Sequence, residues 1–99
     1  MSKRSKATDI SQKVKNIVWK RDNNQCIICG NPNAMPNAHY ISRAKGGLGI
    51  EQNIVTLCMK CHHDYDNGFK REENKKLIKE YLESKYEDWS ETSLIYKKY

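Results

Sequence analysis

The sequence has no long apolar run. No stretch approaches the roughly 20 consecutive apolar residues that a membrane-spanning helix needs, and the basic start MSKRSKATDI lacks the apolar core of a signal peptide. We therefore expect a cytoplasmic protein without membrane contact. Disulfides are rare in the cytoplasm, so cysteines paired at short spacing there favour metal binding over cross-linking.

Apolar residues are scarce as well. Only 37% of the 99 residues are hydrophobic and 30% are charged, so we expect one domain with a thin core that needs a metal or covalent staple. Lys and Arg outnumber Asp and Glu by 18 to 12, which gives a formal net charge of +6. This charge favours a polyanionic partner such as nucleic acid, although lysines that only keep a small protein soluble would give the same balance.

The amino-terminal part reads as an arm followed by a helix. Residues 1–7 are polar and lysine-rich and predict a loose basic arm, with the single domain occupying residues 8–99. Thr8 or Asp9 can cap a helix that ends near residues 22–24. The buried stripe of this helix recurs every three to four residues and consists of Ile10, Val14, Ile17 and Val18.

The core of the domain is expected at residues 25–68, where turn residues dominate. Short strands are predicted at residues 39–42 and 54–57, joined by a glycine-rich hairpin loop, with a helix starting near Cys58. A carboxy-terminal helical segment, residues 70–99, follows. Its main helix spans Arg71–Lys85, and its last apolar patch, which predicts a short final turn, consists of Trp89, Leu94 and Ile95.

Four cysteines form two Cys-x-x-Cys pairs, Cys26 with Cys29 and Cys58 with Cys61. A two-residue gap lets both thiolates of a tight turn face one ion, so the pairs together predict a closed, tetrahedral, structural Zn²⁺ site. Two disulfides or a redox Cys-x-x-Cys are the competing readings. They fit less well, because no secretion signal is visible and nothing resembles the strand and helix alternation of a thioredoxin-type fold.

The stretch NAHYISRAKGG at residues 37–47, followed by NIVTLC at 53–58 and then Cys61 and His62, resembles the HNH nucleases. The likeness covers residues 25–66. It implies an α+β fold, a small zinc-stapled ββα-metal domain with flanking amino- and carboxy-terminal helices. It also implies a metal-dependent DNA endonuclease, a hydrolase of phosphodiester bonds of the kind common in phage and mobile elements, which would work in the host cytosol.

The resemblance assigns three catalytic positions, His39, Asn53 and His62. His39 would be the general base that activates water, because a neutral imidazole suits that task near pH 7. Asn53 would brace the loop through hydrogen bonds. His62 and Asp66 are four residues apart on one helix face, so both could hold a catalytic divalent ion such as Mg²⁺ or Mn²⁺. The family usually has a further metal ligand where this sequence has Ala38, which leaves that ion with fewer protein ligands.

The resemblance also implies DNA as the partner. Arg43, Lys45 and His63 would contact phosphates near the cut. Phage packaging proteins or other nucleic-acid-processing proteins, and a second copy of the chain, are the further partners that this reading allows. Two alternatives stay open from the sequence: a non-catalytic zinc-stabilised DNA-binding module, and a protein-interaction adaptor that uses the charged carboxy-terminal helix.

Overall fold

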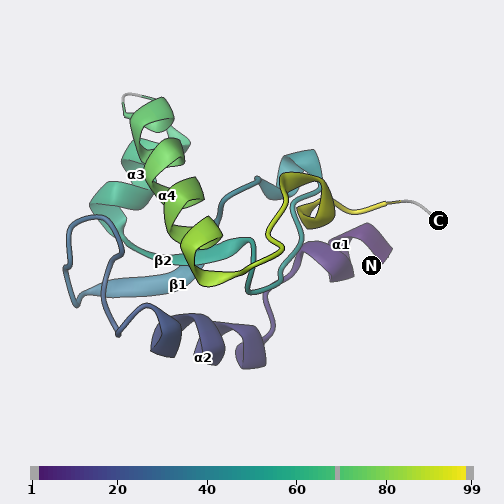
Figure 1. Cartoon of the computed structure of the whole chain (residues 1–99), viewed down its shortest axis with the longest axis horizontal. Helices are drawn as coiled ribbons and strands as arrows, with labels where there is room; N and C mark the ends of the chain where they lie inside the picture. The colour runs from purple at the N-terminus through teal and green to yellow at the C-terminus, as the bar shows by residue number, and fades with distance from the viewer. Residues whose placement is uncertain (1–2, 69, 98–99) are drawn as a thin grey trace.

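The computed structural model describes residues 3–68 and 70–97, and the side chains of all of these except residues 3–5. It combines helices with one two-stranded sheet, so the predicted α+β class is confirmed (Figure 1). No described helix has both the length and the apolar character needed to cross a bilayer. In chain order the elements are α1 Lys3–Thr8, α2 Gln12–Arg21, β1 Ala34–His39, the 3₁₀ turn η1 Arg43–Lys45, β2 Ile54–Cys58, α3 Met59–Asp66, α4 Arg71–Lys85 and the 3₁₀ turn η2 Glu91–Leu94.

The sheet is an antiparallel hairpin with an irregular register between Met35 and Ala38. Its first strand, β1, begins at Ala34, five residues before the strand predicted at residues 39–42. The ladder stops near Ile41 because a side chain takes over: the Ile41 backbone N–H donates to the Asn53 side-chain oxygen at 2.9 Å. The second strand and the helix after it lie close to their predicted positions.

Helices cover both faces of the hairpin. Helix α2 packs on one face, and α3 and α4 pack together above the other (Figure 1). All five residues of β2 are buried, and all except Thr56 are apolar, so this strand does not alternate between apolar and polar residues. Helix α4 has the bounds that its apolar stripe predicts, and it buries Asn74, Ile78 and Leu82.

The amino terminus differs from the sequence prediction. Residues 3–8 form α1 where a loose basic arm was expected, and residues 1–2 lie outside the described part of the chain. The Gly49 backbone N–H donates to the Ala7 carbonyl at 2.9 Å, so the end of α1 is held against the long loop. The next helix is capped by Ser11, whose hydroxyl accepts from the Val14 N–H at 3.1 Å, and not by Thr8 or Asp9.

Candidate metal centre

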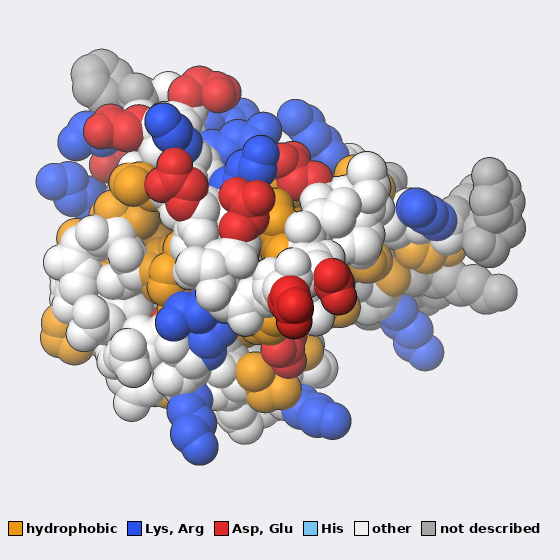
Figure 2. All heavy atoms as spheres, viewed as in Figure 1, with side chains coloured by type: hydrophobic (Ala, Val, Ile, Leu, Met, Phe, Trp, Pro, Cys, Tyr) orange, Lys and Arg blue, Asp and Glu red, His pale blue; other side chains and the backbone are white. Residues whose placement is uncertain are grey.

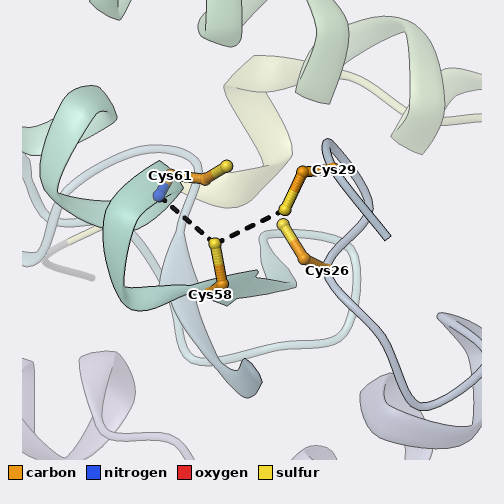
Figure 3. A group of neighbouring side chains, drawn as sticks. All are labelled: Cys26, Cys29, Cys58 and Cys61. Atoms are coloured by element: carbon orange, nitrogen blue, oxygen red, sulfur yellow. Dashed lines mark hydrogen bonds between the residues drawn. The ribbon is translucent and has the colours of Figure 1, made fainter. Parts of the chain in front are cut away.

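The four cysteines converge, although the two pairs come from distant parts of the sequence. Their Sγ atoms all lie within 4.8 Å of one another, and those of Cys29 and Cys58 are 3.6 Å apart (Figure 3). Cys26 and Cys29 come from the loop between α2 and β1, and Cys58 and Cys61 from the junction of β2 with α3. Three of the four side chains are buried, and Cys29 is exposed.

The first pair sits in a tight turn that is fixed to the sheet. The Gly30 N–H donates to the Cys26 carbonyl at 2.9 Å, and Gly30 has a φ of +78°, a conformation that glycine adopts without strain. The Ile27 N–H donates to the Thr56 carbonyl in β2 at 3.0 Å. This bond holds the turn against the strand that carries the second pair.

The second pair uses a helix amino terminus. Cys58 is the N-cap of α3, and its Sγ accepts from the Cys61 backbone N–H at 3.4 Å. The free N–H groups of a first helical turn stabilise negative charge, so this position suits a thiolate. The spacing of two residues therefore places both sulfur atoms at the start of one helix.

The pKa values of two cysteines in the cluster are shifted in opposite directions, and a bound cation would favour the thiolate form of both. Burial disfavours the Cys26 thiolate, but backbone N–H donors from Cys29, Cys58 and Ile28 outweigh burial and lower the pKa of Cys26 to about 7. Burial and the neighbouring Cys58 sulfur raise the pKa of Cys61 far above its usual range. Four thiolates this close repel one another, and a bound metal ion removes that repulsion and favours their deprotonated forms.

The dimensions fit one ion. With a metal–sulfur bond of about 2.3 Å, a tetrahedral site has sulfur atoms about 3.8 Å apart, close to the spacing of the cluster, whose ligand atoms all lie within 4.8 Å of one another. In a multi-iron cluster the cysteines bind different iron atoms and stand farther apart. Among the described residues, this is the one group of three or more His, Cys, Asp or Glu side chains close enough to hold an ion. Metal binding by these cysteines is thus consistent with the structure, while zinc as the metal is untested.

The residues predicted to form a catalytic site do not form a second metal cluster. The Nε2 atom of His39 lies 2.9 Å from the Thr8 carbonyl, and burial lowers the pKa of His39. His62 and Asp66 face each other, with Nε2 and Oδ2 3.2 Å apart, as their spacing on α3 predicts. One ring nitrogen of each histidine thus has a protein partner, and His39 and Asp66 line one pocket, but no described third ligand joins His62 and Asp66.

Asn53 and the predicted phosphate contacts lie on the loop and on α3. The fully buried Asn53 side chain donates to the carbonyls of Ile41 and Leu48, so it bridges the two ends of the loop. Arg43 forms an ion pair with Asp9. The remaining two predicted contacts, Lys45 and His63, are exposed.

Comparison with known proteins gives one informative relative. The chain is 36% identical over 58 residues to Anaredoxin from Nostoc sp. (strain PCC 7120 / SAG 25.82 / UTEX 2576), an alignment that covers 58% of this chain and 71% of Anaredoxin. The chain belongs to the Anaredoxin family. No family model matches the chain, and no solved structure matches it.

This membership overturns the nuclease hypothesis. The name Anaredoxin denotes a redox protein and not a nuclease. The predicted HNH family, endonuclease activity and DNA partner are therefore wrong, and so are the DNA-binding alternative and the packaging partners. The roles predicted for His39, Asn53 and His62 stay predictions, while the four-cysteine ion site is the one that the described residues form.

Proposed function

We propose that this protein is a one-electron carrier that holds a single iron ion between its four cysteines. The observation that carries the proposal is the gathering of Cys26, Cys29, Cys58 and Cys61 into one cluster of single-ion size. Membership of the Anaredoxin family supports redox chemistry at that cluster. When bound, iron would supply a reversible change between the ferrous and ferric states.

The protein's own residues would suit this exchange in two ways. The backbone N–H donors to Cys26, and the Cys61 N–H that donates to Cys58, offset part of the negative charge on sulfur. Such hydrogen bonds stabilise the more negative, reduced form and so tune the reduction potential. Both turns are anchored by backbone bonds to β2 or α3, so the sulfur positions can change little when the charge changes.

The test is reconstitution of the purified chain with ferrous iron under anaerobic conditions. We expect one iron per chain, sulfur-to-iron charge-transfer absorption after oxidation, and a reversible one-electron wave in protein-film voltammetry. The zinc-loaded chain is the redox-silent control. Failure to bind iron, or a stoichiometry of two or four irons per chain, would contradict the proposal.

A structural Zn²⁺ is the second candidate, because the site is closed by four thiolates, three of the cysteines are buried and the core around them is small. The two candidates differ in whether the iron-loaded chain retains its iron through repeated oxidation and reduction. A carrier keeps its iron through repeated oxidation and reduction. A site built only for zinc would lose the ferric ion and leave oxidised cysteines.

A further inference from the structure

One of the four ligands differs from the others in its access to solvent. Cys26, Cys58 and Cys61 are buried, whereas Cys29 is exposed. Electron tunnelling falls off steeply with distance, so the shortest route between a bound ion and a docked protein runs through the exposed Cys29 sulfur. The route by which electrons enter and leave is therefore fixed by the turn that carries Cys29.

The surface around Cys29 has almost no charge. Residues 23–42 contain no Asp, Glu, Lys or Arg, in a chain of which 30% is charged. The exposed residues that precede and follow Cys29 in the sequence are neutral, and the Gln25 side-chain nitrogen lies 3.6 Å from the position that a Cβ atom would take on Gly30. We call this the Cys29 surface, and it consists of Gln25, Cys29, Gly30, Asn31 and Pro32.

The charges gather elsewhere. The sequence of α4, REENKKLIKEYLESK, is mostly charged. In Figure 2 blue and red side chains crowd the top of the view, over α3 and α4, while the left edge, where Figure 1 shows the cysteine loop, is mainly white and orange. Asp22, the charged residue nearest in sequence to this surface, is buried.

We propose that the Cys29 surface is the docking site for a redox protein that presents an uncharged, apolar surface around its own redox centre. This inference rests on the proposed function. An uncharged surface costs less to desolvate than a charged one, while a charged partner would have to bury charge without compensation. Association should therefore depend weakly on salt, despite the net charge of +6.

The electron balance of the exchange is simple. The ferrous site gives one electron and becomes ferric, and the acceptor, a one-electron outer-sphere oxidant, gains that electron. No bond forms or breaks, and no proton needs to move. Small complexes that act as such oxidants can therefore report where the exchange occurs.

The first experiment locates the surface that binds a neutral, apolar probe, and it involves no electron transfer. The zinc-loaded chain is titrated with tris(acetylacetonato)chromium(III), a neutral, apolar, paramagnetic complex, and amide NMR signals are followed. We expect the strongest broadening at residues 25–31. Strongest broadening on α4 or around η2 would overturn the proposal.

The second experiment places a charge beside Cys29. Rates of oxidation of the iron-loaded chain by ferricyanide and by tris(phenanthroline)cobalt(III), which carry opposite charges, are compared at an ionic strength of about 0.1 M, where charges act over about 10 Å. Gln25→Glu should slow ferricyanide and speed the cobalt complex by about threefold each, and Gln25→Lys should do the reverse. Thr92→Glu and Thr92→Lys are the matched controls, because Thr92 is exposed on η2, away from the cysteine loop (Figure 1), and they should change both rates by less than about 1.5-fold.

The outcomes separate the two proposals. Iron content and the reversible potential are measured first for the wild-type chain and for each variant. A wild-type chain that binds no iron, or that shows no reversible potential, would contradict electron carriage itself. If both hold but the Gln25 and Thr92 variants respond equally, the carrier stands and the Cys29 surface does not.

Discussion

Two polar clusters in this small core are completed in different ways. The four sulfur atoms repel one another when ionised and need a cation from outside the chain. The second cluster, around Arg21 and Asp22, is complete from protein atoms alone. The fully buried Asp22 carboxylate accepts from Arg21 at 2.7 Å, from the Tyr81 hydroxyl at 2.5 Å and from the Thr56 N–H at 2.8 Å.

Arg21 is satisfied just as fully. It donates to the backbone carbonyls of Glu51 and Ile54, each at 2.7 Å, and to the Tyr86 hydroxyl at 3.1 Å. Burial opposes its charge, but pairing with Asp22 outweighs burial and raises the pKa of Arg21. This network joins α2, the strand β2 and the end of α4.

The clusters meet at Thr56. Its N–H donates to Asp22, and its carbonyl accepts from Ile27, in the turn of the first cysteine pair. One side of the residue thus belongs to the self-sufficient network and the other to the metal-dependent one. The network can therefore hold β2 in place, while the cysteine turns depend on the ion.

The largest expected effect is the loss of the metal ligand set. Cys58→Ser removes a thiolate, and structural zinc contributes about 10 kcal/mol or more in small domains, as much as the whole stability of such a fold. We expect the variant to be unfolded by circular dichroism at 25 °C and to bind no stoichiometric metal. Met59→Ser, at the neighbouring exposed position, is the control and should fold. A folded Cys58→Ser chain would show that the Asp22 network suffices alone.

Asp22→Asn comes next, because it leaves the buried Arg21 charge without its partner. Breaking a buried ion pair typically costs about 3–5 kcal/mol, and urea unfolding of the zinc-loaded chain would measure the loss. The double variant Arg21→Met with Asp22→Asn should recover part of it, since no unpaired charge remains. If the double variant is less stable than Asp22→Asn, the hydrogen bonds of Arg21 matter more than its charge.

Tyr81→Phe tests a single bond of the network. The variant loses the hydroxyl that donates to Asp22 but keeps the ring over which Arg21 lies, 5.6 Å from its centre. A hydrogen bond to a charged group contributes about 2 kcal/mol, so we expect a loss of that size in the free energy of unfolding, with metal affinity unchanged. A weaker hold on zinc in this variant would mean that the network also positions the cysteine turns through Thr56.

The sequence predicts those features that depend on neighbouring residues. The bounds of α4 follow from its apolar stripe, and the two cysteine pairs follow from their two-residue gaps. The end of β1 could not be placed, because it is set by the Asn53 side chain, twelve residues beyond Ile41. The ordering of α1 likewise depends on Gly49, far along the chain.

The site was predicted in part for the same reason. Four thiolates bind zinc and iron with one geometry, so ligand type alone could not decide between a structural and a redox ion. From the sequence, Asp22 is predicted only to mark the end of α2. Its role as the acceptor of a buried network depends on Tyr81 and Thr56, which the fold brings next to it. The signal that sequence reading missed is the absence of charge at residues 23–42, around the exposed Cys29.

The smallest effect is expected at a surface ion pair, which serves as the reference for both buried clusters. Lys79 on α4 and Glu91 on η2 are 3.4 Å apart, with side chains 44% and 41% exposed. Water and salt screen such a pair, so Lys79→Gln should lower the free energy of unfolding by less than about 1 kcal/mol, and by nothing measurable in 1 M salt. A larger loss that persists in high salt would show that the Lys79 stem packs η2 onto α4. The contrast between the two clusters assumes that exposed charges contribute less to stability than buried ones. That assumption would then fail for this surface ion pair.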